Sequence, residues 1–594
     1  MKPKIKTLLV LVIVLGMVAG ALPQAVSAAN TRLSLTLYYM PVSRPYFPDA
    51  KSVAEIMQKN LQAVGINIKL VTMDWGEYLE ATEDGEHDMC MLGWSADIAD
   101  PSNFIEVLLH SKAAVVGTAM NVAFYKSDAV DDLLDAAISE TNQTIRDTQY
   151  KDAMWIIHKD SPWATIAHAD NIAGSLTSVS NFVIHPTGPG ANVYGNVSKT
   201  AATELIIGRS GDSDSLDPAH FTDGQSWMVA RQIYDGLYNM PADSEIAVPA
   251  LATGYTVSDD GLNYNLTLRQ GVKFSDGTDF NASSVVFSFE RARDWGENET
   301  VYMQNGWSPP EVGYYDFIYG AYNMTIEEID TYTVRFDFET VYGPFIQSLG
   351  MGVFSIVSPT YVKAHPYDPE AGSIDHLAFK PVGTGPYKLV SWEEDSLITL
   401  TKNSEYWGAA AKMDTLIFKV ITENAARIGA LTGSTPTIDI TGNIAATDAK
   451  TLEDASGVNL KSQSGMNVGY LAMNFLKEPF SITTLVDDPD FGGQTKQGYL
   501  VARAINYAID KDTILEEVYQ GKAIKAKNPS PPGITLGYND SIPHYEFNAT
   551  KAQVMLDSLG YVSTPVTAGF DTFFMLVSTL GVLATFVAFR RKRR

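Results

Sequence analysis

Cysteine is almost absent from this chain, whose 594 residues include one, Cys90. A single cysteine cannot form an intrachain disulfide, so packing alone must hold the fold together. Basic residues are also scarce, with 43 Lys and Arg against 69 Asp and Glu and a formal net charge of -26. Because contacts to phosphates require a basic surface, this balance opposes nucleic-acid binding. We therefore expect no nucleic-acid partner.

Signatures of catalysis and of nucleotide binding are also missing. Residues 208–215 lack the G-x-S-x-G spacing of a nucleophile elbow. Pro386 follows the pair Gly383 and Gly385 and removes an amide that a phosphate-binding loop would use. His87 is a lone imidazole among carboxylates, which is typical of a solvated turn rather than a zinc site. We therefore expect a protein that is not an enzyme and that holds no metal or cofactor.

The front of the chain has the pattern of a signal peptide over residues 1–28. Three lysines precede an apolar run at residues 8–22, and small side chains at residues 26–28 suit cleavage. A signal anchor is the alternative, but the apolar run is short for a membrane span and Pro23 follows it. We therefore expect export.

The end of the chain has the pattern of a membrane anchor. After a spacer at residues 562–571, residues 572–589 are uncharged and apolar over a length that can cross a membrane as a helix. The basic residues 590–594 should stay in the cytoplasm, which places the rest of the chain outside the cell. Residues 569–570 resemble the sorting segments of archaeal surface proteins, although Ala568 stands where proline is usual, and a plain transmembrane anchor is the alternative. Export would also expose eight N-x-[ST] glycosylation sequons, at Asn142, Asn196, Asn265, Asn281, Asn298, Asn323, Asn539 and Asn548.

The residues between the two ends alternate short strands with amphipathic helices. Residues 264–268 place apolar side chains at every second position, as a half-buried strand does, and residues 283–291 place them on one helical face. At the front, residues 33–39, 52–64 and 66–71 predict a strand, a helix and a strand, which is typical of a βαβ unit. A chain of this length is too long for one core, so we expect an α/β protein of two or three lobes.

Seven segments between residues 204 and 561 stand in an order that is known from one family. The segments are SDSLDP at 213–218, IYDGL at 233–237, the stretch 257–291, PVGTGPYKLVSW at 381–392, NSEYWG at 403–408, YLAMNF at 470–475 and ARAINYAIDKDTI at 502–514. They resemble the extracellular solute-binding proteins of the oligopeptide, dipeptide and nickel ABC importers, family 5.

The resemblance implies a two-lobed periplasmic-binding-protein fold of the large, type II class, with the ligand cleft between the lobes. It also implies a monomeric receptor that captures oligopeptides or dipeptides and delivers them to an ABC permease and its ATPase. One lobe should combine residues 204–470 and 170–198, and the other residues 471–561 and 31–169. The open alternatives are another solute, such as an oligosaccharide or a nickel complex, an exported hydrolase, and a structural surface protein.

The order of the segments departs from the family at both ends. The part that usually closes the family's chain stands at the front, in residues 29–200, and the opening and middle parts follow in residues 201–561. No segment occurs twice and none is obviously absent, which favours a circular permutation. The new linker would lie near residues 199–204. A truncated tandem, an error in the gene model and an exchange of segments between neighbouring chains are the alternatives.

The candidate ligand site lies in GWSADIADP, residues 93–101. The resemblance places on Asp97 the carboxylate that pairs with the α-amino group of a peptide, a comparatively strong charge-assisted contact. It places Trp94 at a side-chain pocket, with Ser95 and Ala96 between the two. Ile98 stands where the family often has an aromatic residue. A role in a turn or a helix cap is the alternative for Asp97.

Three further residues are candidates on the resemblance. Met473 and Asn474 lie on the expected inter-lobe strand, where they could present backbone groups to the ligand, and core or hinge packing is the equal alternative. Tyr234 is a candidate for the cleft wall, with a core aromatic as the alternative.

Overall fold

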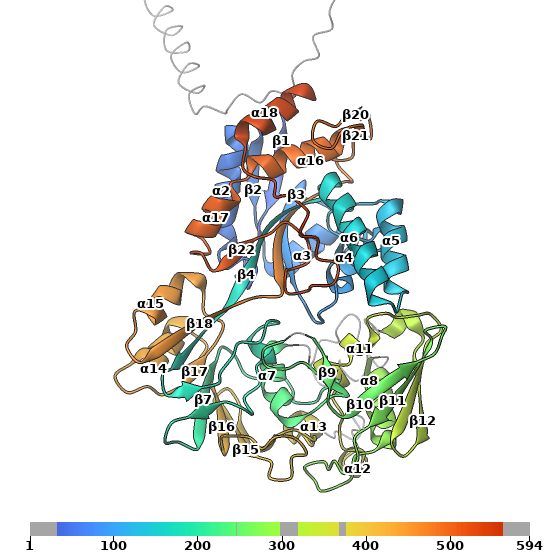
Figure 1. Ribbon diagram of the computed structural model, residues 1–594. Coiled ribbons are helices and arrows are strands. Elements are labelled where there is room, and N and C mark those ends of the chain that lie inside the picture. Colours follow the sequence, from blue (N-terminus) through green and yellow to red (C-terminus); the bar gives the residue numbers. More distant parts are fainter. Residues whose placement is uncertain (1–31, 222, 245, 297–318, 367–375, 562–594) are drawn as a thin grey trace, which may run out of the picture.

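The computed structural model describes residues 32–221, 223–244, 246–296, 319–366 and 376–561. These residues form two lobes, one above the other in Figure 1, which long strands join near the middle. The expected signal peptide, spacer, membrane span and basic tail lie outside the described residues. Among the residues that are described, no helix is both long and apolar enough to cross a membrane.

One sheet of 12 strands runs through both lobes. The lower lobe holds one end of the sheet and the upper lobe the other (Figure 1). In spatial order the strands are β14 (Tyr387–Glu393), β15 (Leu397–Lys402), β16 (Thr415–Val420), β7 (Glu204–Arg209), β17 (Ile440–Thr441), β4 (Trp163–Leu176), β19 (Asn467–Met473), β3 (Met89–Ser95), β1 (Ser34–Tyr38) and β2 (Asn67–Val71), with β18 (Val458–Ser464) and β22 (Ala523–Lys525) paired to β4 beside this path.

β4 is the strand that the two lobes share. Its first residues, from Trp163 to Ala167, pair with β19 in the upper lobe, and residues 170–176 pair with β18 in the lower lobe. The crossing at residues 169–170 agrees with one predicted lobe boundary, but the other, predicted at residues 470–471, falls inside β19, which lies in the upper lobe. Because paired strands join the lobes here, a change in the angle between the lobes must come from bending at this crossing.

The predicted βαβ unit is confirmed in the upper lobe. β1 and β2 are parallel, with Ser34 opposite Asn67, and α2 (Ala50–Ala63) connects them. The Asp49 side chain caps α2 by accepting a hydrogen bond from the amide of Ser52, and Gly65 follows the helix at a φ of 89°, which glycine adopts readily. The other elements of this lobe are α3 (Trp75–Glu83), α4 (Ser102–Leu109), η1 (Ser111–Ala113), α5 (Asp128–Ile138), α6 (Gln143–Asp160), β20 (Leu485–Asp487), β21 (Gln494–Lys496), α16 (Gln497–Ala508), α17 (Lys511–Glu517) and α18 (Ala549–Ser558).

The lower lobe adds an antiparallel sheet of four strands, β10 (Ala252–Val257), β11 (Asn263–Leu268), β13 (Thr333–Asp337) and β12 (Thr325–Asp330). The predicted alternation holds, since Tyr264, Leu266 and Leu268 are buried, and the predicted helix at 283–291 lies within α8 (Ala282–Gly296). The remaining elements are β5 (Val179–Ser180), η2 (Pro189–Ala191), β6 (Ser198–Lys199), α7 (Gly224–Ile233), β8 (Tyr238–Asn239), β9 (Val248–Pro249), η3 (Gly320–Tyr322), α11 (Phe345–Ser348), η4 (Gly352–Phe354), α12 (Pro359–Ala364), α13 (His376–Phe379), α14 (Asn424–Thr432), η5 (Ala446–Asp448) and α15 (Ala449–Glu453).

Three of the family-like segments meet at one buried carboxylate in the lower lobe. Asp235, from IYDGL, accepts hydrogen bonds from the Thr384 hydroxyl at 3.0 Å and from the Trp407 indole at 2.8 Å. Its other oxygen accepts from Asn239 at 2.8 Å. Burial raises the pKa of Asp235, and these donors act against that rise. The segments therefore serve the interior of the lobe rather than the ligand cleft.

The front and the back of the chain form one folded unit. β19 lies between β3 and β4, and β17 lies between β7 and β4, so residues 31–200 and 204–561 alternate within the same sheet. The segment at 199–204 connects the β5–β6 pair to β7 in the lower lobe, where Lys199 pairs with Asp439 at 2.9 Å.

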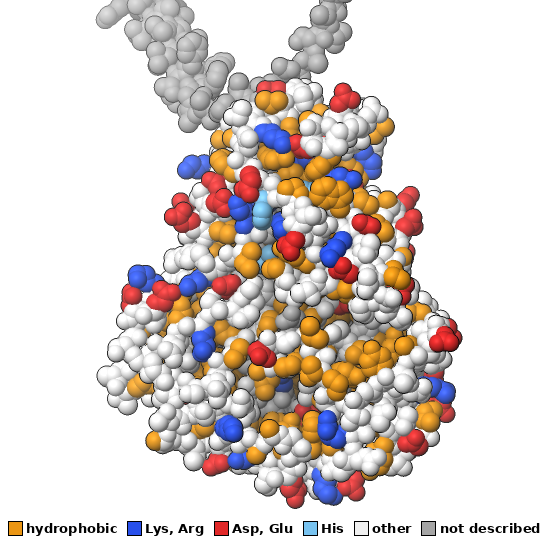
Figure 2. Space-filling model, in the orientation of Figure 1, with side chains coloured by type: hydrophobic (Ala, Val, Ile, Leu, Met, Phe, Trp, Pro, Cys, Tyr) orange, Lys and Arg blue, Asp and Glu red, His pale blue; other side chains and the backbone are white. Residues whose placement is uncertain are grey.

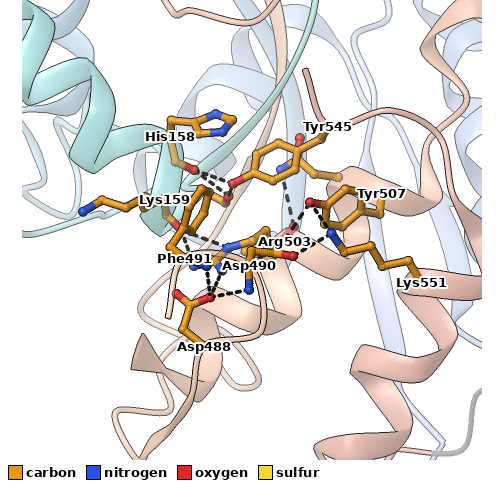
Figure 3. A network of polar contacts seen from close by, with 12 residues as sticks. His158, Lys159, Asp488, Asp490, Phe491, Arg503, Tyr507, Tyr545 and Lys551 are labelled. Atoms are coloured by element: carbon orange, nitrogen blue, oxygen red, sulfur yellow. Dashed lines mark hydrogen bonds and ion pairs between the residues drawn. The ribbon is translucent and has the colours of Figure 1, made fainter. Parts of the chain in front are cut away.

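A buried polar network also joins these two parts in the upper lobe (Figure 3). Arg503 of α16 donates to the carbonyl of Lys159, at the end of α6, and pairs with Asp488 at 2.7 Å in the loop between β20 and β21. Asp490 in the same loop pairs at 2.6 Å with Lys551 of α18. The last described helix is thus held, through this loop and Arg503, to the front part of the chain.

Candidate ligand-binding cleft

Two cavities adjoin each other at the carboxyl end of β3. One, of about 570 Å³, lies in the upper lobe, and the other, of about 390 Å³, lies between the lobes. Both are lined by Pro45, Ser95 and Asp97. Figure 2 shows hydrophobic side chains gathered on the lower lobe where it faces the upper one. Together the cavities form a cleft with Asp97 at their junction.

Asn103 fixes the orientation of Asp97. Its Oδ1 accepts the backbone N–H of Asp97 at 2.9 Å, and its Nδ2 donates to Oδ2 of Asp97 at 3.2 Å. The same Oδ1 lies 3.3 Å from the indole nitrogen of Trp94. Asn103 is buried in the first turn of α4, so one interior side chain positions both the carboxylate and the indole at the cleft.

The neighbouring Asp100 has a structural role. It forms a bidentate ion pair with Arg146 of α6. Nη1 of Arg146 lies 2.9 Å from Oδ2 of Asp100, Nη2 lies 2.9 Å from Oδ1, and both side chains are buried. Burial acts against the charged form of Arg146, but the carboxylate of Asp100 outweighs it and keeps the pKa of Arg146 above its ordinary value. Asp100 does not line either cavity, which leaves Asp97 as the carboxylate of this segment that faces the cleft.

The upper cavity has mostly apolar and aromatic walls. Trp75 stacks on Tyr78 with ring centroids 5.8 Å apart, and the Arg44 guanidinium lies 4.9 Å from the Trp75 ring. Arg44 is the one cation among the described residues that line this cavity. Arg44 is not among the site residues that the sequence predicts, because a single arginine before a proline in a loop forms no distinctive pattern.

Two glycines allow the loop that carries Arg44 to lie against the sheet. Gly93 of β3 is paired with Gly469 of β19. A Cβ at Gly93 would lie 2.2 Å from the ring of Tyr46, and one at Gly469 would lie 2.6 Å from the Tyr46 carbonyl oxygen. The loop is also held by Tyr519, whose hydroxyl donates to that carbonyl at 2.6 Å. The glycine before Trp94 is therefore required by close packing.

The lower wall of the inter-lobe cavity comes from α7 and from the segments around it. Asp223 caps α7 by accepting from the amides of Gln225 and Ser226, both at 2.8 Å. Phe221, Trp227, Met240, Met351 and Val353 supply apolar surface in the same cavity. The charged residues that line it are Asp97 from above and Asp223 from below.

Four of the seven predicted site residues are brought together at the cleft. Trp94, Ser95 and Asp97 line the upper cavity, and Ser95, Ala96 and Asp97 line the inter-lobe cavity. Ile98, where the family often has an aromatic residue, is buried in the hydrophobic core of the lower lobe. Asn103, like Arg44, was not among the predicted residues.

The other three predicted residues lie away from both cavities. Met473 is buried opposite Met89, and Asn474 donates to the carbonyls of Gly85 and His87. The reason is strand direction. Because β19 is antiparallel to β3, its first residue, Asn467, reaches the cleft together with Met466, which precedes the strand. Tyr234 is buried in the core of the lower lobe, so the alternative prediction of a core aromatic is confirmed.

Two histidine-containing groups have structural explanations. His87 is fully buried, not in a solvated turn as expected, and burial lowers its pKa to about 4 while Nε2 bonds to the Val122 carbonyl at 3.0 Å. Glu106, His110 and Asp135 lie close enough together to hold a metal ion. However, Lys112 forms an ion pair with Glu106 and lies 4.0 Å from Asp135, so an ammonium group already balances these carboxylates.

The model of the bacterial extracellular solute-binding proteins, family 5 middle, matches residues 30–115 and 247–579. These residues are well over half of the sequence. The chain belongs to this family.

Relatives in family 5 differ in the solutes after which they are named. The chain is 32% identical over 379 residues to heme-binding protein A of Haemophilus influenzae, covering 61% of this chain and 62% of the relative. It is 30% identical over 370 residues to the dipeptide-binding protein of Escherichia coli, with coverages of 60% and 64%. The structure of HbpA2 from Haemophilus parasuis matches with a TM-score of 0.50 and 27% identity over 60% of this chain and 67% of that one. The chain thus spans less than two thirds of the length of these two curated relatives.

Proposed function

We propose that this protein is the substrate-binding receptor of an ABC importer and that it captures short peptides outside the cell. The observation that carries the proposal is the upper cavity, where Asp97 and Arg44 line the same space around aromatic walls. A short peptide at neutral pH has an ammonium group at one end and a carboxylate at the other. The cavity offers an opposite charge to each end and an apolar pocket between them.

The two ends of the peptide would bind differently. Asp97, oriented by Asn103, would accept from the α-amino group, and charge-assisted hydrogen bonds of this kind are about twice as strong as neutral ones. Arg44, which lies against Trp75, would bind the carboxylate with its planar guanidinium group. A cavity of about 570 Å³ is in the range that encloses small ligands, which favours dipeptides and similar peptides over long ones.

Closure of the lobes would complete the site and signal occupancy. Ser95 and Asp97 from the upper lobe and Gln225 and Trp227 from the lower lobe line the same inter-lobe cavity. A ligand that touches both walls would stabilise the closed state by its differential affinity for that state. The permease and its ATPase would recognise the closed form.

The test is a ligand screen with the full-length protein. Thermal unfolding should shift upward with dipeptides, because a ligand that binds only the folded state stabilises it. An oligosaccharide, a nickel complex and heme serve as the competing solutes. A response to one of these, with no shift for any dipeptide, would reject the peptide assignment and leave the receptor fold intact.

We also propose that the chain is a circular permutant of the usual family order. The alternation of residues 31–200 and 204–561 in one sheet supports this, since a remnant of a second receptor would not supply the missing strands. A gene rearranged to encode 204–561, a linker and then 32–200 should yield a protein with the same ligand affinity. Failure of that protein to fold, while the natural order folds, would count against the permutation.

Export and anchoring remain part of the proposal. β1 and α18, near the two ends of the described chain, lie at the end of the upper lobe that is remote from the lower lobe (Figure 1). A membrane anchor after residue 561 would therefore hold the upper lobe nearest the membrane. A protein truncated after residue 561 should be released from the membrane fraction, and retention of the truncated chain would contradict this.

A further inference from the structure

A small cavity in the upper lobe is lined by hydrogen-bond donors that lack acceptors. Its volume is about 20 Å³, and it shares no lining residue with the two cavities of the ligand cleft. Its walls come from the end of α6, the start of β4, α16, α17 and the segment after β22. We propose that this cavity binds one monatomic anion, such as chloride, between the side chains of Lys511, Trp163 and His158.

Trp163 supplies an indole N–H without an acceptor. Trp163 is 5% exposed, and its Nε1 has no hydrogen-bond partner in the described part of the chain. The ring is stacked on Tyr470, with centroids 3.7 Å apart and planes 3° from parallel, so packing fixes the direction of the N–H group. An indole nitrogen can only donate, and an unpaired buried donor destabilises a fold. An acceptor in the cavity would remove this penalty.

His158 offers a second donor at the same cavity. Its Nε2 is buried and has no hydrogen-bond partner among the residues that the structure describes. Burial, with the cations Lys511 and Arg503 nearby, lowers the pKa of His158 to about 3, so the imidazole is neutral near pH 7. Its ring is held against that of Tyr545, with centroids 4.4 Å apart (Figure 3). In the tautomer that carries its proton on Nε2, His158 therefore presents a fixed donor.

Lys511 brings a positive charge that has no counter-charge of its own. It is 4% exposed, it lines the cavity, and its ammonium group forms no ion pair with a described residue. The two carboxylates that act on it, Asp512 and Glu546, pair instead with Lys525, at 2.8 and 2.9 Å. Burial lowers the pKa of Lys511 to about 7, since the charged form is poorly compensated. An anion in the cavity would supply the missing charge.

The lining favours a small anion over a cation, a larger anion or water. The charged residues that line the cavity are Lys511 and Lys527, and no carboxylate of the described residues lines it. Lys527 has its own partner in Asp540, at 3.3 Å. A volume of about 20 Å³ admits one water molecule or one monatomic ion, which excludes phosphate and carboxylate ligands. A water molecule would accept from Trp163 and leave the charge of Lys511 unbalanced, whereas chloride would satisfy both.

A bound anion would connect the front and the back of the chain. His158 and Trp163 belong to residues 31–200, and Lys511 belongs to residues 204–561. Without an anion, the buried ammonium group lowers the stability of the fold, and a bound anion would offset that loss. The stability of the upper lobe should therefore depend on which anion the solution contains.

The test replaces one anion by another at constant ionic strength. Thermal unfolding of the full-length protein is followed as chloride or bromide replaces gluconate, which is too large for the cavity. The pH is about 6, so that Lys511, with its pKa of about 7, carries its proton. We expect either halide to raise the unfolding temperature by about 1–3 °C and the rise to saturate, because a ligand that binds only the folded state stabilises it. Equal unfolding temperatures in halide and gluconate would show that the cavity holds only water and would overturn the inference.

Two variants locate the anion, and chloride NMR line broadening measures its binding directly. Lys511→Met should abolish the halide shift and the broadening, because it keeps the stem and removes the charge. Trp163→Phe keeps an aromatic ring, removes the N–H group and should weaken halide binding about tenfold. Lys59→Met, at an exposed lysine, is the matched control and should behave as the wild type. Full halide affinity in Lys511→Met or in Trp163→Phe would overturn the inference, whatever the protein does with peptides.

Discussion

The amide group of Asn103 contacts Asp97 at two points, accepting from its backbone N–H at 2.9 Å and donating to its carboxylate at 3.2 Å. The side chain that the family resemblance assigns to the ligand is thus fixed by a residue that the ligand need not touch. Asn103 is a positioning residue in this account. Its effect should appear in the affinity for peptides that have a free amino group.

The first prediction concerns this contact. Asn103→Ala should weaken binding of a free dipeptide about tenfold, because the carboxylate loses its orientation and one charge-assisted hydrogen bond. Asn474→Ala is a matched control, since Asn474 is also buried and bonds two carbonyl groups, but away from both cavities. That control should lose stability and keep its dipeptide affinity. Titrations well below both unfolding midpoints separate the two effects, and equal losses of affinity would contradict the assignment.

The second prediction concerns the glycine under Tyr46. Gly93→Ala should displace the loop that carries Arg44, since the new Cβ would lie 2.2 Å from the Tyr46 ring and 2.5 Å from the Val468 carbonyl oxygen. We expect both a lower free energy of unfolding and a lower peptide affinity. Gly76→Ala, in α3, meets no atom within 4 Å and should instead stabilise the protein by about 0.5–1 kcal/mol. Denaturant unfolding and calorimetry check both variants, and normal affinity in Gly93→Ala would count against the role of this loop.

The third prediction concerns the buried network that joins the front and back of the chain (Figure 3). Arg503→Met should lower the free energy of unfolding by about 3–5 kcal/mol, because it leaves Asp488 and the Lys159 carbonyl without their buried partner. Lys551→Met removes a half-exposed cation and should cost less. Urea unfolding measures both. A loss below about 1 kcal/mol for Arg503→Met would mean that the network contributes little to stability.

The fourth prediction is a pH dependence. Lys511, at the start of α17, is almost fully buried, and burial, with Lys525 nearby, lowers its pKa to about 7. The unfolded chain keeps a lysine pKa of about 10.4 and so binds more protons between these two values. Lys511 therefore destabilises the fold most below about pH 7, and this penalty disappears as the pH rises toward about 10.

Lys511→Met should accordingly be more stable than the wild type by about 1–3 kcal/mol at pH 7, and the difference should shrink by about pH 10. The exposed Lys59→Met is the control and should show no such trend. Unfolding curves in urea at a series of pH values give the comparison. A difference between Lys511→Met and the wild type that stays constant with pH would contradict the low pKa.

Much of the fold could be predicted because local pattern and family order agree. The strand, helix and strand at residues 33–71 are visible from their periodicity, and the structure confirms them as β1, α2 and β2. The lobe boundary near residue 170 also follows from the family order. The βαβ unit depends on short-range patterning, which is visible in a single sequence, whereas the lobe boundary depends on the resemblance to the family.

The site was only partly predictable because long-range pairing decides which end of a strand reaches the cleft. Met473 ends the strand that the sequence indicates and Asn474 follows it, but the antiparallel register with β3 brings Met466 and Asn467 to the cavity instead. Arg44 enters the site because Gly93 and Gly469 let its loop lie close to the sheet. No local sequence pattern around Arg44 predicts that its loop packs against these two glycines.

Asp97 is proposed to bind the α-amino group of a short peptide in a cavity that it shares with Arg44. The most direct test is calorimetric titration of the wild type and of Asp97→Asn, in the full-length protein, with a dipeptide and with its N-acetylated form. We expect Asp97→Asn and N-acetylation each to weaken binding by about tenfold or more, and N-acetylation to cost little further affinity in the variant. Full affinity of Asp97→Asn for the free dipeptide would show that Asp97 does not bind the α-amino group.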